Sequence, residues 1–134
     1  MAAARPRLTR ILETVLYYSA GDEEAVRRFY ADVLGLPRVG RGLNFRLGDG
    51  LLLLFDAAAS SVQDSPPPHG ASGPVHTCFV AAEPDYTAWK AYLEERDVAL
   101  LEEIAWDSGV RSFYFADPAG NVLEIAEGDM WPTA

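Results

Sequence analysis

The chain has 134 residues, of which 49% are hydrophobic, and eleven Lys and Arg against twenty Asp and Glu give a formal net charge of −9. This length and composition are typical of one globular domain and exclude a disordered chain. The longest apolar run, residues 51–55, is too short to span a membrane, and the acidic balance argues against nucleic acid or an anionic membrane as a partner. A single cysteine, Cys78, and an N-terminus without a long apolar core predict a cytoplasmic protein.

The first half of the chain predicts a strand, a helix and then three short strands. Residues 11–18 are dense in β-branched, aromatic and aliphatic side chains, which is typical of a strand. Acidic residues at 22–24, followed by apolar residues at helical spacing, predict a helix that ends at Gly35. Glycine-rich turns separate the three short strands, which we expect at residues 38–40, 43–47 and 51–55.

The second half repeats this order after a loop rich in serine, proline and glycine. The expected elements are a strand at 75–82, a helix at 83–93, and strands at 98–104, 110–115 and 122–126. Both halves therefore follow the order βαβββ, and such a doubled module implies two similar half-sheets related by a pseudo-twofold axis. We predict one α+β domain over residues 1–134, with module one at about 10–57, the loop at 58–73 and module two at about 74–128.

Three ionisable residues stand in predicted strands where apolar side chains are expected: Glu13, His76 and Glu124. Each alone has a structural explanation, because an antiparallel strand often keeps one face in water and a lone histidine is often a hydrogen-bonded core residue. Glu13 and His76, however, occupy matching places at the starts of the two modules, and Glu124 lies on the strand that ends the second. Pseudo-symmetry could bring all three together, where two carboxylates and an imidazole would bind a divalent metal and leave coordination sites open.

Four segments carry a family resemblance that covers nearly the whole chain. They are residues 13–17 (ETVLY), 28–36 (RFYADVLGL), 69–76 (HGASGPVH) and 112–124 (SFYFADPAGNVLE). With them the sequence resembles the glyoxalase, bleomycin-resistance and extradiol-dioxygenase superfamily, also called vicinal oxygen chelate proteins. The resemblance implies two βαβββ modules whose sheets curl around a common cavity, a homodimer, and metal ligands at Glu13, His76 and Glu124.

The chain departs from the family pattern at two ligand positions. The first ligand in the family is more typically His or Gln, whereas this chain has Glu13. Glyoxalase I has a fourth ligand, a glutamate on the last strand of the first module, and that place falls here on Leu54, or on Leu53 after a one-residue shift. Leucine binds no metal, so the sequence argues against glyoxalase I activity itself.

Five further residues are candidates for substrate contact or acid–base chemistry. Tyr114 has a spacing similar to that of the tyrosine which, in several family enzymes, hydrogen-bonds the metal-bound substrate oxygen, although it could simply pack in an aromatic strand. Alternation places Ser112 on the face of Tyr114, with Asn44 and Arg46 on the corresponding strand of the first module. Arg46 could hold an anionic group or lie on the surface. His69, in the proline-rich loop, could cap the cavity as a mobile acid or base, or have no role.

Together these features predict a small metal-dependent enzyme that chelates vicinal oxygens of a small-molecule substrate and stabilises an enolate-like anion, as a lyase or isomerase. The cofactor is one divalent ion, and imidazole with carboxylates suits Mn, Fe, Ni, Co or Zn. The alternative is a metal-free protein, similar to bleomycin-resistance proteins, that binds a basic or aromatic drug in an acidic cleft. A second alternative is a ring-cleaving dioxygenase, which would need iron and normally two histidines, and Glu13 counts against it.

Overall fold

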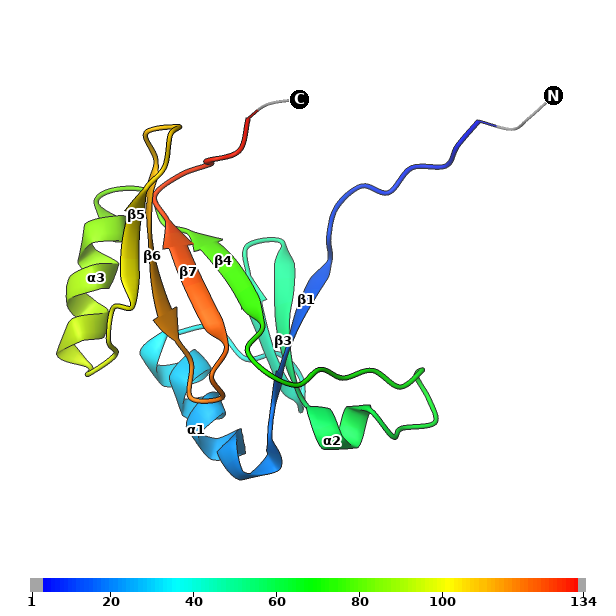
Figure 1. The fold of residues 1–134 in the computed structure, drawn as a ribbon. Coiled ribbons are helices and arrows are strands. Elements are labelled where there is room, and N and C mark those ends of the chain that lie inside the picture. The colour runs from blue at the N-terminus through cyan, green and yellow to red at the C-terminus, as the bar shows by residue number, and fades with distance from the viewer. Residues whose placement is uncertain (1–3, 133–134) are drawn as a thin grey trace.

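The computed structural model describes residues 4–132 and contains two β-sheets with helices packed against them (Figure 1). The three-stranded sheet has the order β1 (Glu13–Tyr18), β3 (Gly50–Asp56) and β2 (Leu43–Leu47). The four-stranded sheet has the order β4 (His76–Val80), β7 (Val122–Ala126), β6 (Arg111–Ala116) and β5 (Glu102–Ala105). In each sheet the first strand lies parallel to the last, and the last lies antiparallel to the one before it. The two sheets therefore repeat one topology, as the doubled pattern predicts.

Short helices connect the strands. A 3₁₀ turn (Ala20–Asp22) leads into α1 (Glu23–Arg28), which widens into a π-helical segment (Phe29–Val33), and the second module contains α3 (Asp85–Glu95). The predicted loop begins with one helical turn, α2 (Ala57–Ser60), because the Asp56 carboxylate accepts a hydrogen bond from the Ala58 N–H at 3.0 Å. Within residues 4–132, none of the helices is both long enough and apolar enough to cross a membrane.

The first module lacks one of its three predicted short strands. Residues 38–40 form only an isolated bridge between Arg38 and Phe45. The Arg38 guanidinium donates hydrogen bonds to the carbonyls of Arg41 and Gly42, which closes this segment into a local turn in place of a strand. The first sheet consequently has three strands where the second has four.

A single hydrophobic core serves both modules. Alternate residues of the strands point into it, among them Leu16 and Leu52 from the first sheet and Phe113 and Leu123 from the second. The Phe29 ring, which belongs to the first module, packs 6.3 Å from the Phe115 ring of the second. The residues between these core positions, which include the ionisable ones singled out above, lie on the opposite faces of the sheets.

The turn between β6 and β7 is organised by a buried carboxylate. Asp117, 5% exposed, accepts hydrogen bonds from the backbone N–H groups of Ala119 and Asn121 on Oδ1, at 2.9 Å each. Its Oδ2 accepts from the Asn121 amide at 2.9 Å and from the Tyr30 hydroxyl at 2.6 Å. Tyr30 lies on the helix of the first module, so this carboxylate links the two halves of the chain. Burial, together with the Asp117 charge, raises the pKa of Tyr30, which keeps the phenol protonated as a donor.

Asn121 extends the link to the strands. Its amide nitrogen donates to the Tyr17 carbonyl at 3.0 Å, and its amide oxygen accepts from the Val75 N–H at 3.3 Å. Tyr17 is near the end of β1, and Val75 immediately precedes β4. The end of β1 therefore lies beside the start of β4.

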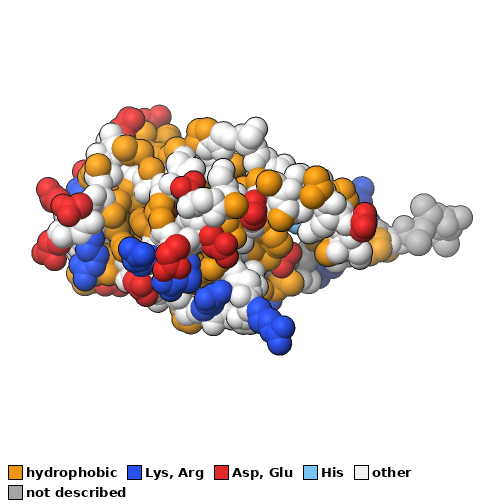
Figure 2. Space-filling model, turned by 90° about the horizontal axis from the view of Figure 1, so that it is seen from below, with side chains coloured by type: hydrophobic (Ala, Val, Ile, Leu, Met, Phe, Trp, Pro, Cys, Tyr) orange, Lys and Arg blue, Asp and Glu red, His pale blue; other side chains and the backbone are white. Residues whose placement is uncertain are grey.

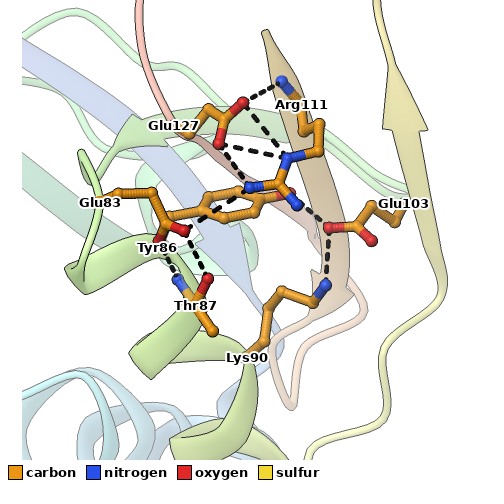
Figure 3. Close-up of polar contacts among 7 residues, drawn as sticks. All are labelled: Glu83, Tyr86, Thr87, Lys90, Glu103, Arg111 and Glu127. Atoms are coloured by element: carbon orange, nitrogen blue, oxygen red, sulfur yellow. Dashed lines mark hydrogen bonds and ion pairs between the residues drawn. The ribbon is translucent and has the colours of Figure 1, made fainter.

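A network of seven polar side chains joins α3 to the second sheet (Figure 3); its members are Glu83, Tyr86, Thr87, Lys90, Glu103, Arg111 and Glu127. Glu103 accepts hydrogen bonds from Tyr86 and Lys90 at 2.7 Å each, and Arg111 donates to Glu127 at 2.8 Å. The hydrogen bond from Lys90 is the largest cause of a lowered pKa at Glu103, and the hydrogen bond from Arg111 has the same effect on Glu127.

We predict that Tyr30→Phe lowers the free energy of unfolding by about 1.5–3 kcal/mol, because it removes a buried hydrogen bond to a carboxylate. Asp117→Ala costs more, since it leaves the Asn121 amide and two turn N–H groups without their acceptor. Urea denaturation measures both. Tyr92→Phe, which removes a hydrogen bond to the carbonyl of Val33, is the control for loss of a tyrosine hydroxyl elsewhere. An equal loss in the free energy of unfolding for Tyr30→Phe and Tyr92→Phe would contradict a larger contribution from the hydrogen bond to Asp117.

The network in Figure 3 predicts a loss of stability in acid. A carboxylate whose pKa is lowered in the folded state stabilises the fold above its unfolded pKa of about 4.3, and this contribution disappears as the pH falls through the folded value. The free energy of unfolding should therefore decline below about pH 5. Glu103→Gln should be less stable than the native protein at neutral pH, and its free energy of unfolding should decline less steeply as the pH falls. Urea denaturation at several pH values between 3 and 7 measures the free energy of unfolding. The same dependence on pH in the native protein and in Glu103→Gln would contradict this assignment.

Candidate metal centre

His76 and Glu124 meet on the face of the second sheet that points away from the core. His76 is the first residue of β4, and Glu124 is the middle residue of β7, its neighbour in the sheet. Their Nε2 and Oε1 atoms lie 3.1 Å apart. Glu124 is 2% exposed, whereas the His76 side chain is half exposed. The pair therefore combines a buried carboxylate with an imidazole that reaches the surface.

The backbone fixes the tautomer of His76. Its Nδ1 lies 2.8 Å from the Val122 carbonyl oxygen, which can only accept a hydrogen bond, so Nδ1 carries a hydrogen. In a neutral imidazole Nε2 then has a lone pair, and this lone pair faces a carboxylate oxygen of Glu124. Two acceptors at 3.1 Å require a proton or a cation between them.

The second carboxylate oxygen of Glu124 has no partner. Oε2 is buried and makes no hydrogen bond, an arrangement that is costly for a carboxylate. A divalent cation would satisfy this carboxylate, and an imidazole with a carboxylate is a donor set suited to Mn, Fe, Ni, Co and Zn. Bonds of about 2.0–2.2 Å from one ion to both ligands are compatible with their 3.1 Å separation. These two residues fit the predicted metal.

Tyr114 and Cys78 flank Glu124 on the neighbouring strands. Each is paired with Glu124 in the sheet register, Tyr114 from β6 and Cys78 from β4, and the Tyr114 ring stacks on His76 at 5.9 Å. Burial, with the Glu124 carboxylate, raises the pKa of Tyr114 above its usual value and that of Cys78 to about 12. Both groups stay protonated at neutral pH. The structure thus places Tyr114 beside His76 and Glu124.

Ser112 shares this face but is covered by a residue that the sequence analysis did not identify. The Ser112 hydroxyl is fully buried and accepts a hydrogen bond from Trp106 Nε1 at 2.9 Å. Trp106 follows β5, two residues beyond the expected strand, and strand alternation continued past Ile104 would have placed it on the same face.

Glu13 does not join this pair within one chain. It is exposed at the start of β1, and no group of three His, Cys, Asp or Glu residues able to hold a metal occurs among residues 4–132. The reason is strand direction: Asn121 places Tyr17, and not Glu13, beside the start of β4. Glu13 lies four residues before Tyr17 in β1, about 13 Å from it along the strand. The expectation that pseudo-symmetry brings Glu13, His76 and Glu124 together in one chain is therefore not met.

Glu13 instead lines a cavity of about 550 Å³ on the first sheet. Asn44 lines the same cavity, together with Arg38 and Arg41. Arg46 is exposed and is not among the lining residues, whereas Arg38 and Arg41 are.

The sheet register identifies the first-module counterpart of Glu124. His76 pairs with Val122, and Glu124 lies two residues further along that strand; in the first sheet Glu13 pairs with Leu51, so the matching position is Leu53. Leu54, the other candidate, points into the core. The first module therefore supplies no carboxylate at this place.

His69 is held on the first sheet. Its Nδ1 lies 2.7 Å from the Tyr17 hydroxyl, and its ring packs edge-on against Phe55 at 4.8 Å. Its backbone N–H also donates to the Ser60 carbonyl at 3.0 Å. The His69 ring is thus held on two sides, at the end of β1 that lies nearest to β4.

Comparison with known proteins agrees with this architecture. The structure is similar to that of a lactoylglutathione lyase from Agrobacterium tumefaciens, with 37% sequence identity, a TM-score of 0.86 and coverage of 96% of this chain and 100% of that one. A glyoxalase/bleomycin resistance protein/dioxygenase from Nocardioides shares the fold, with 21% identity, a TM-score of 0.72 and coverage of 99% of this chain and 93% of that one. The oxidase ChaP-H1 also shares it, with 23% identity, a TM-score of 0.65 and coverage of 93% of this chain and 100% of that one. No curated protein matches the sequence.

The sequence also matches a family model over residues 10–125, which is most of the chain. That family is the one whose motifs the sequence resembles. The chain belongs to the Glyoxalase/Bleomycin resistance protein/Dioxygenase superfamily.

Proposed function

We propose that the protein is a metal-dependent enzyme that binds a small molecule through two neighbouring oxygens and stabilises an enolate-like anion, as a lyase or isomerase. The observation that carries this proposal is the buried Glu124 carboxylate, which faces His76 Nε2 with one oxygen and has no partner for the other. A protein that only sequesters a ligand has no need for such an arrangement, because it costs stability. The similarity to a lactoylglutathione lyase favours lyase chemistry.

His76 Nε2 and the Glu124 carboxylate would hold one divalent ion of Mn, Fe, Ni, Co or Zn. When bound, the ion supplies Lewis-acid stabilisation of negative charge on substrate oxygen. The hydrogen bond from Nδ1 to the Val122 carbonyl orients the imidazole and keeps its Nε2 lone pair turned toward the site.

The protein's own groups can carry the proton transfer. Breaking a C–H bond next to a substrate carbonyl would send the proton to the Glu124 carboxylate and leave the electron pair on the carbonyl oxygen as an enolate. The Tyr114 phenol, whose raised pKa keeps it protonated, would donate a hydrogen bond to that oxyanion. His69, fixed by Tyr17, is a further acid–base candidate from the adjoining end of the first sheet. Ser112 and Asn44 remain candidates for substrate contact.

Glu13 would complete the site from a second chain in a homodimer. In one chain the face around His76 is open, and on this face Val80 is 67% exposed. Ile11 and Leu12, next to Glu13, are also exposed apolar residues. Pairing the first sheet of one chain with the second sheet of another would bury these residues and add a second carboxylate to the metal.

The single-cysteine sequence favours the cytoplasm as the location of such an enzyme.

A metal-free drug-binding protein is the rival function, and it would be favoured by an acidic cleft. On the face seen in Figure 2, acidic and basic side chains alternate with hydrophobic ones in place of a single-sign patch. The cavity on the first sheet is likewise mixed, since three carboxylates, Glu13, Glu23 and Asp56, line it together with two arginines, Arg38 and Arg41. The excess of one carboxylate is a small attraction for a basic ligand, and the two arginines oppose it.

Without metal, we predict that Glu124→Gln is more stable than the native protein. The glutamine amide can donate to His76 Nε2 and removes a buried negative charge, so the melting temperature in EDTA should rise by about 3 °C. Added Ni²⁺ or Zn²⁺ should then stabilise the native protein and leave the variant unchanged. Differential scanning calorimetry measures both. A variant that melts lower in EDTA would mean that the carboxylate stabilises the fold itself.

The shared site predicts complementation between two variants. We expect about one divalent ion per chain in the native protein by inductively coupled plasma mass spectrometry, and strong loss in both Glu13→Ala and Glu124→Gln. Co-refolding the two variants in equal amounts should restore about a quarter of the native metal, because half of the dimers are mixed and each mixed dimer has one intact site.

The alternatives give distinct results. Restoration of no metal, with both variants folded, would place the ligands of each site within one chain. Absence of metal from the native protein after dialysis against Mn, Fe, Ni, Co and Zn would overturn the enzyme proposal and favour the drug-binding function.

A further inference from the structure

Trp106 lies on the same face of the second sheet as the metal pair. In the antiparallel pairing of β5 and β6, Ile104 is opposite Ser112, and strand alternation places Trp106, two residues on, on the same side. The Trp106 N–H donates to the Val110 carbonyl at 3.0 Å, so the hairpin continues through this residue. Trp106 is 37% exposed, which leaves about a third of a large aromatic residue open to solvent.

The indole is held in place by a buried hydroxyl. Its Nε1–H donates to Ser112 Oγ at 2.9 Å, and Ser112 is fully buried. This bond uses the only donor of the indole, so the exposed part of the side chain is its apolar ring. The ring is therefore a rigid apolar surface.

This surface lies on the same face of the second sheet as the residues around Glu124. Along β6, Ser112 is followed two residues later by Tyr114 on the same face, and Tyr114 is paired with Glu124. The Tyr114 ring in turn stacks on His76. Trp106, Tyr114 and His76 thus lie on one face of the second sheet, with Ser112 linking Trp106 to the strand that carries Tyr114.

We propose that Trp106 determines specificity: it selects substrates that carry a planar unsaturated or aromatic group next to the two chelating oxygens. The inference rests on the proposed function, because the chelating oxygens are placed by the metal at His76 and Glu124. With those oxygens fixed near Glu124, a flat substituent directed toward β5 would lie against the indole. An aliphatic substituent of similar reach would make a poorer contact with this surface.

Two hydroxamic acids test this inference. Acetohydroxamate and benzohydroxamate present the same pair of oxygens to a metal and differ only in a methyl or a phenyl substituent. The protein loaded with Ni²⁺ or Zn²⁺ should bind benzohydroxamate more tightly, by about three- to tenfold. In Trp106→Ala this preference should disappear, while the affinity for acetohydroxamate stays within about twofold of the native value. Isothermal titration calorimetry measures all four affinities.

Three variants control the comparison. Trp106→Phe keeps a flat apolar ring and should retain most of the preference. Trp131→Ala removes a tryptophan that is 75% exposed in the C-terminal segment and should retain all of it. Ser112→Ala removes the acceptor of the indole N–H, so the preference for benzohydroxamate should weaken. Circular dichroism and metal content confirm that each variant is folded and loaded.

The outcomes separate this inference from the function on which it rests. Equal affinity of the native protein for both compounds, or a phenyl preference that survives Trp106→Ala, would overturn the role of Trp106 and leave the metal site intact. Failure of both compounds to bind the metal-loaded native protein would overturn the proposed chelating function, and the role of Trp106 with it.

Discussion

The arrangement of both modules depends on the buried carboxylate of Asp117. It accepts hydrogen bonds from Tyr30 in the first module and from the turn that begins β7 in the second, so it is the electrostatic link between the two halves. Asn121, held by this carboxylate, then ties the end of β1 to the start of β4. One short turn thereby sets both the relative position of the sheets and the register at the end where His76 and Glu124 lie.

The geometry of the His76–Glu124 pair follows from this turn. Val122 is the residue directly after Asn121, and its carbonyl receives the Nδ1 hydrogen of His76. The same strand carries Glu124 two residues later, on the same face and within reach of Nε2. The position and the tautomer of the imidazole are therefore both properties of the backbone, which is a rigid support for a ligand.

The sequence predicts the repeated topology and the pairing of His76 with Glu124, because strand alternation and the matched order of the two modules are local patterns. It misplaces Glu13, since alternation gives the face of a strand but not which ends of two strands meet. That depends on hydrogen bonds such as the one from Asn121 to Tyr17, 104 residues apart in sequence. It misses Trp106 for a related reason, because the residue lies beyond the expected strand and its role depends on the hairpin that extends it.

Glu124 is the point at which the fold and the function conflict. Its neighbours on the sheet are a thiol and a phenol that stay protonated, behind it lies the shared hydrophobic core, and its Oε2 is buried without a hydrogen bond of normal geometry to any described residue. A leucine occupies the corresponding position of the first module, which demonstrates that the topology itself accepts an apolar residue there. The carboxylate is therefore not a requirement of the architecture. Its burial beside an oriented imidazole is better explained by a cation than by stability.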